Sequence, residues 1–157
     1  MNFASFPILT QLHPAVIHFP MALLYVEFFF LCLYLAKGKE EYDKFSHWLL
    51  LLCSLSFVPV LLTGLHDSGA DLGPGVQLIN GLFDRVENFL RFESTISIHV
   101  ICSLLVVCNT LARLLWRMKA GKNVYKGLQC PLFFALTVCG LVVAAVTGYQ
   151  GGSISHS

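Results

Sequence analysis

Four apolar runs, each about 20 residues long, constrain this chain more than any other feature of its sequence. About 20 helical residues cross the roughly 30 Å of hydrocarbon in a bilayer. Each run must be helical in lipid, because a lone helix satisfies its own backbone groups there. The predicted spans are residues 14–36, 46–65, 95–116 and 131–149. Together they predict an all-α integral membrane protein, a four-transmembrane-helix bundle in which residues 1–157 form a single membrane domain.

Lysine and arginine set the expected orientation of this bundle. The loops between spans one and two and between spans three and four carry most of them: Lys37, Lys39 and Lys44; Arg117, Lys119, Lys122 and Lys126. The long middle loop holds only Arg85 and Arg91, offset by acidic residues, and neither terminus holds any. Because basic loops stay on the cytoplasmic side, both termini and the middle loop are expected on the outer side.

The middle loop carries its own helical pattern. Between residues 76 and 92 the apolar side chains recur at helical spacing: Ile79, Leu82, Phe83, Val86, Phe89 and Leu90. This pattern predicts an outer amphipathic helix between spans two and three. It would lie on the membrane surface or cover the mouth of the bundle. A partner-binding face is the alternative use.

The two halves of the chain show signs of an internal repeat. His18 lies near the start of span one and His99 near the start of span three, while spans two and four end in Thr63-Gly64 and Thr147-Gly148. The pattern is that of two repeated hairpins related by an axis along the membrane normal. Spans one and three would then be parallel and diagonally opposed, with His18 and His99 at matching depths.

Four histidines fall at the predicted outer end, namely His13, His18, His66 and His99. Polar groups in membrane spans are costly and indicate function by default. One interpretation is a b-type haem, with His18 and His99 as axial ligands of its iron and with His13 and His66 near a propionate or a quinone head group. A second is a zinc or copper site that also uses Asp67. A third is structural, with imidazoles bonded to backbone carbonyls and water.

Glu27 is an intramembrane carboxyl near the middle of span one. At that depth a carboxyl is expected to be protonated or paired. A neutral carboxyl bonded to another helix is the favoured interpretation, and a proton path is the alternative. A third possible function is a permease, but only Glu27 and Arg113 suggest a polar path through the bundle. On span four, Gly140, Ala144 and Gly148 form a stripe that allows close helix packing or leaves room for a flat cofactor.

The segment LHPAVIHFPMAL at residues 12–23 resembles the opening motif of a bacterial family of small four-helix membrane proteins of unknown function. The resemblance extends to Glu27, to Thr63-Gly64 and to His99, and covers nearly the whole chain. The Glu where an Asp is commoner and the six cysteines depart from it. With the resemblance, the expected location is a bacterial inner membrane, in which the basic loops place both termini on the periplasmic or outer side. The resemblance also implies work beside Rieske-type or cytochrome modules, with which some relatives are linked.

These features favour a membrane b-type haem-binding electron-transfer subunit, with haem b as cofactor and membrane or periplasmic redox subunits as partners beside the lipid bilayer. The alternative is a non-catalytic structural or assembly subunit without a cofactor. An electron carrier or accessory subunit fits better than an independent enzyme, because the chain has no nucleophile elbow and no phosphate-binding glycine loop. A net charge of +1 gives no case for nucleic acid.

Overall fold

The computed structural model describes the helix backbones over residues 12–67 and 95–155, and their side chains over 16–63 and 98–150. Four long helices occupy the chain there: α2 (Leu12–Lys37), α3 (Glu40–Asp67), α5 (Thr95–Ala120) and α6 (Gln129–Ser155). A short 3-10 helix, η2 (Gly121–Tyr125), links the last two. All four long helices are long and apolar enough to cross a membrane, so the predicted all-α membrane bundle is confirmed. The predicted amphipathic helix at 76–92 lies outside the described residues.

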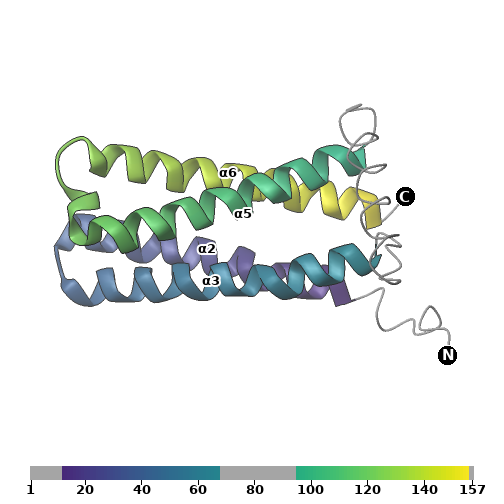
Figure 1. The fold of residues 1–157 in the computed structure, drawn as a ribbon, viewed down its shortest axis with the longest axis horizontal. Coiled ribbons are helices and arrows are strands. Elements are labelled where there is room, and N and C mark those ends of the chain that lie inside the picture. The colour runs from purple at the N-terminus through teal and green to yellow at the C-terminus, as the bar shows by residue number, and fades with distance from the viewer. Residues whose placement is uncertain (1–11, 68–94, 156–157) are drawn as a thin grey trace.

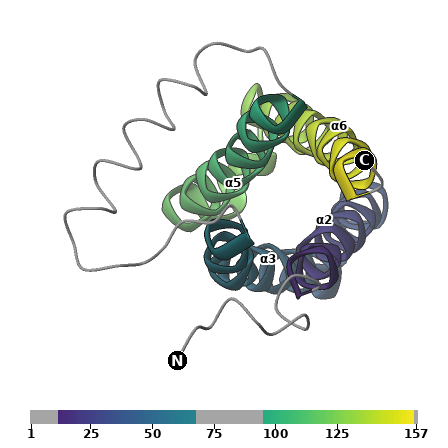
Figure 2. The same cartoon turned by 90° about the vertical axis from the view of Figure 1, so that its right-hand side faces the viewer.

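The helices form two antiparallel hairpins, α2–α3 and α5–α6 (Figure 1). Seen along its axis, the bundle places α2, α3, α5 and α6 in cyclic order (Figure 2). α3 therefore neighbours α5, and α2 neighbours α6. Consequently α2 and α5 run in the same direction at diagonally opposite corners, which is the arrangement that the two-hairpin pattern predicts.

Every helix extends beyond the span predicted for it, and at the amino end α3 does so most. It begins at Glu40 rather than near residue 46. Its first turn carries Glu40, Glu41 and Asp43, and acidic side chains stabilise the amino end of a helix through its dipole. The hydrophobic run marks only the part inside hydrocarbon, whereas the helix continues into the headgroup region. The tight turn before it uses Gly38 at φ 66°, whose N–H donates to Tyr34 O at 2.8 Å.

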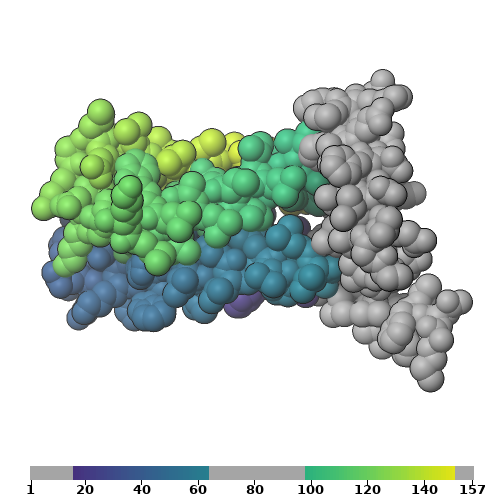
Figure 3. Space-filling view, in the orientation of Figure 1, coloured from purple at the N-terminus to yellow at the C-terminus, as the bar shows by residue number. Residues whose placement is uncertain are grey.

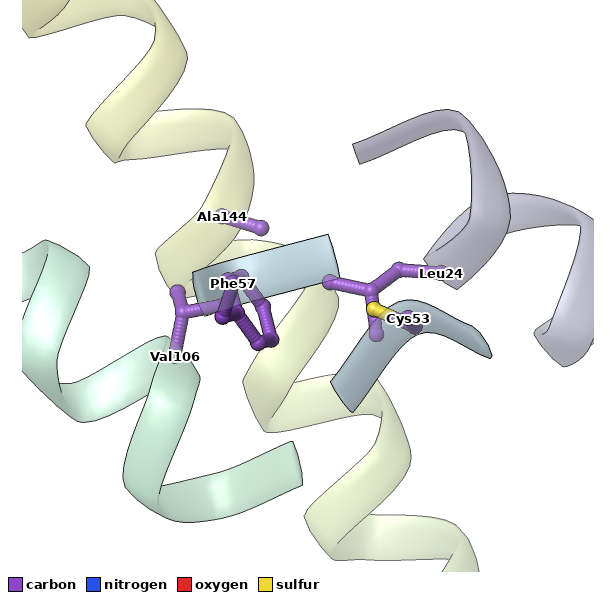
Figure 4. Close-up of a cluster of buried hydrophobic side chains, with 5 residues drawn as sticks. All are labelled: Leu24, Cys53, Phe57, Val106 and Ala144. Atoms are coloured by element: carbon purple, nitrogen blue, oxygen red, sulfur yellow. The ribbon is translucent and has the colours of Figure 1, made fainter. Parts of the chain in front are cut away.

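Two apolar clusters lie inside the bundle. The middle cluster draws on all four helices and consists of Leu24, Cys53, Phe57, Val106 and Ala144 (Figure 4). The second lies near the short loops and consists of Leu31, Val124 and Phe133. Lipid is as apolar as these side chains, so close van der Waals packing holds them together rather than exclusion from water.

The small residues of α6 serve this packing. Ala144 is fully buried in the middle cluster. A Cβ built on Gly140 would lie 2.6 Å from Asn109 Oδ1, and one on Gly148 would lie 3.4 Å from the Met21 methyl group. Both glycines therefore let side chains of other helices approach closely, which confirms the packing interpretation of the stripe.

Candidate functional site

A chain of buried charges runs through the half of the bundle that carries the short loops. The two hairpins are in close contact over that half (Figure 3). Four charged side chains lie inside it, namely Glu27, Asp43, Arg113 and Arg117, of which the most exposed is only 9% accessible. Within membrane spans such groups are rare and mark functional sites by default.

Glu27 and Arg113 form an ion pair across the diagonal of the bundle. Arg113 Nη2 donates to Glu27 Oε2 at 2.6 Å, and the two residues are 1% and 0% exposed. Ser46 on α3 donates its hydroxyl to Glu27 Oε1 at 3.1 Å. Glu27 lies ten residues before Lys37, about 15 Å of helix from the end of α2. The carboxyl is bonded to another helix, as expected. Its partner is a guanidinium, so the carboxyl is paired rather than alone at that depth.

Arg117 extends the chain one turn further toward the loops. Its Nη1 donates to Ser46 Oγ at 3.0 Å, and its Nη2 donates to the carbonyl of Asp43 at 2.5 Å and to the carboxylate of the same residue. Ser46 thus accepts from Arg117 and donates to Glu27, which joins the two ion pairs into one network. Two arginines on α5 therefore hold groups on both α2 and α3.

Aromatic rings cover the two guanidinium groups. Arg113 Cζ lies 5.2 Å from the centre of the Phe133 ring, and Arg117 Cζ lies 5.5 Å from that of Tyr125. A cation over a ring face is attracted by the ring's electrons, and more strongly away from water. Phe133 comes from α6 and Tyr125 from η2, so every helix of the bundle contributes to holding the charges.

Within the described side chains, three polar atoms beside this network are buried without a hydrogen-bond partner: Arg113 Nε, His47 Nδ1 and the Tyr125 hydroxyl. The network contains two guanidinium groups and two carboxylates, so its formal charges cancel. A buried ion pair is costly to desolvate, and its Coulomb attraction largely offsets that cost. The arrangement can therefore fix the helices relative to one another.

At the other end of the bundle, His99 is held by a backbone carbonyl. Its Nδ1 lies 3.1 Å from Thr147 O, on the neighbouring helix α6. His99 is partly buried and precedes Val106 by two turns on the inward face of α5. His18 is exposed, on the side of α2 away from the buried Pro20 and Leu24. The structure therefore places one of the two predicted axial histidines inward and the other outward.

The remaining predicted residues of this end, His13 and His66, lie in α2 and α3 but outside the described side chains. The same holds for Asp67 of the metal alternative. Over side chains 16–63 and 98–150, no group of three or more histidine, cysteine, aspartate or glutamate residues could hold a metal ion.

Sequence reasoning missed half of the charge network. From the sequence, Arg117 is predicted in a loop, because it stands at the end of an apolar run, and Asp43 is not singled out. One signal was available in the sequence. Arg113 and Arg117 are four residues apart and continue the face of His99 and Val106, so they had to share the inward side of one helix.

The fold and this network define a class: a four-helix integral membrane protein whose hairpins are joined by buried ion pairs. The chain belongs to the family of predicted membrane proteins DUF2231, whose model matches residues 10–157. That match confirms the resemblance to a membrane protein family of unknown function. Comparison with curated proteins and with solved structures gave no match.

Proposed function

We propose that this protein is a membrane b-type haem-binding electron-transfer subunit of a larger envelope redox complex in the bacterial inner membrane. The observation that carries the proposal is the contact between His99 Nδ1 and Thr147 O. A carbonyl accepts only from a protonated nitrogen. The contact therefore selects the tautomer in which Nε2 carries the lone pair.

In that tautomer Nε2 is the ring nitrogen that could bind haem iron. Metal-binding imidazoles usually donate their second ring N–H to a carboxylate or a backbone carbonyl, which orients the ring. His99 has this arrangement, with the carbonyl supplied by α6 while the ring is carried by α5. When bound, haem would supply one-electron transfer, and the part of His99 is to orient and hold it.

The second axial ligand is sought on α2, the parallel helix at the opposite corner. His18 has the matching depth but is exposed in this structure. Position 13 precedes the buried Pro20 by seven residues, about two helical turns, and so shares its register. The proposal keeps His18 and His99 as the axial pair, with His13 and His66 close by, and makes His13 the first substitute for His18.

An absorption spectrum of the detergent-purified protein from haem-replete cells tests the proposal. We expect a Soret band and sharp bands on reduction. His99→Ala should abolish these bands. Of His18→Ala and His13→Ala, the variant that loses the six-coordinate spectrum identifies the second ligand. His47→Ala is the matched control, because His47 lies on α3 near the loop end. A colourless wild-type protein, or a His99→Ala variant with an unchanged spectrum, refutes haem binding.

A non-catalytic structural or assembly subunit is the second candidate, and the exposure of His18 favours it. An imidazole on the outer face of a helix is available to a neighbouring subunit rather than to the bundle interior. Measuring particle mass after solubilisation in mild detergent tests this candidate. It predicts a larger assembly that His18→Ala weakens, and a stable lone monomer contradicts it.

A further inference from the structure

A shallow groove on the lipid-facing side of α3 is lined by Glu41, Lys44, Phe45 and Trp48. The two aromatic side chains are largely exposed, Phe45 at 56% and Trp48 at 60%. Phe45 stacks on Phe30 of α2 with ring centres 5.2 Å apart, which fixes one wall of the groove. The groove therefore has a positioned apolar part and two charged residues at one end.

Its depth places the charges among lipid headgroups. The apolar window of α3 runs from Glu40 to Thr63, 24 residues, or about 36 Å along the axis. The hydrocarbon layer is about 30 Å thick, so the first turn of α3 extends beyond it. Glu41 and Lys44 then stand at headgroup level, and Trp48, about 10 Å further along than Glu41, reaches the acyl chains.

The two charges at the end of the groove have no direct partner among the described side chains, although Lys44 also acts electrostatically on Glu40. Among the described side chains, Glu40 pairs with Lys122 at 2.5 Å, whereas neither Glu41 nor Lys44 makes an ion pair or a hydrogen bond. Glu41 and Lys44 are both exposed and lie three residues apart, on the same side of the helix. An acceptor and a donor of opposite charge thus stand side by side above an apolar surface.

We propose that this groove binds one phospholipid with a primary-ammonium headgroup, of the phosphatidylethanolamine type. Lys44 pairs with the phosphate, Glu41 accepts from the ammonium, and an acyl chain lies along Phe45 and Trp48. The charge complementarity selects this class. A choline headgroup has no N–H to donate to Glu41, and a glycerol headgroup leaves that carboxylate facing a net anion.

Native mass spectrometry of the detergent-purified full chain tests this, with phosphatidylethanolamine, phosphatidylcholine and phosphatidylglycerol added separately. We expect the one-lipid complex to favour phosphatidylethanolamine by about threefold, the range of an exposed charged hydrogen bond. Glu41→Gln should remove the preference over phosphatidylcholine, because an amide accepts from the ammonium only weakly. Lys44→Gln should lower the binding of all three lipids.

Two matched controls separate a site from general lipid contact. Glu40→Gln removes the neighbouring carboxylate, already occupied by Lys122, and Lys119→Gln removes an exposed lysine of α5; both should leave the preference unchanged. Equal binding of the three lipids by the wild type overturns the proposal, as does an equal loss with Lys119→Gln. Haem content plays no part in this readout, so it is independent of the proposed electron transfer.

Discussion

Replacing Glu27 by glutamine should destabilise the bundle strongly, although the side chain keeps its size. The change leaves the Arg113 guanidinium, 1% exposed, without its counter-charge. Two unit charges about 4 Å apart attract by about 4 kcal/mol at an effective dielectric of about 20. Breaking a buried pair on one side typically costs about 3–5 kcal/mol. Ser46 can still donate to the amide oxygen, so we expect about 3 kcal/mol.

The measurement is reversible unfolding in mixed micelles, titrated with a denaturing detergent and followed by the fluorescence of Trp48 and Trp116. Arg113→Met should cost a similar amount, because it leaves the carboxylate buried. The double variant removes both charges and should recover about 2 kcal/mol relative to the sum of the single changes. Glu40→Gln is the exposed control, and its cost should be much smaller, because water screens that pair.

Either of two results would refute this reasoning. The first is a Glu27→Gln variant that is no less stable than Glu40→Gln. The second is additivity of the Glu27 and Arg113 changes, since independent effects would mean that the two groups do not stabilise each other in the bilayer-like environment.

Three further changes test other parts of the structure. Gly140→Ala should cost about 1 kcal/mol in the same titration, because the new Cβ would displace Asn109 and break the hydrogen bond from Asn109 Nδ2 to Leu136 O. Adding Asn109→Ala should make room for the methyl group and reduce this cost. Gly38→Ala should cost about 1 kcal/mol through its positive φ alone, since nothing lies within 4 Å, and Gly38→Asn should cost less; equal costs would contradict a backbone origin. For orientation, a membrane-impermeant thiol reagent added to intact spheroplasts should spare Lys39→Cys and label a cysteine placed at Asn2, and the reverse result would invert the proposed topology.

Much of the fold follows from length and apolar composition. The four spans were predictable because an unbroken apolar run of that length has few other stable states. The diagonal placement of α2 and α5 followed from the two-hairpin pattern. The ends of the helices were harder to predict, because charged turns such as that of Glu40 to Asp43 carry no hydropathy signal although they are helical.

The candidate site was less predictable, because the sequence does not indicate how α2 is rotated about its own axis. Nearly every position of α2 between Val16 and Ala36 is apolar, so periodicity does not indicate which side faces inward. His18 was matched to His99 by depth alone. The inward face is instead marked by Glu27, whose partner Arg113 lies 86 positions away in the chain. Haem binding at the outer end remains a prediction.

The four-residue spacing of Arg113 and Arg117 also has a consequence for alignment along the membrane normal. Apolar helices in lipid resist sliding past one another only weakly, because one apolar contact replaces another at little cost. If α5 slid by one turn, about 5.4 Å, toward the end of the bundle opposite the short loops, Arg117 would meet Glu27. Asp43 would then lose its guanidinium, and Arg113 would move one turn toward the apolar layer of Phe57, away from its carboxylate partner. The two arginines therefore fix the position of the second hairpin relative to the first along the membrane normal.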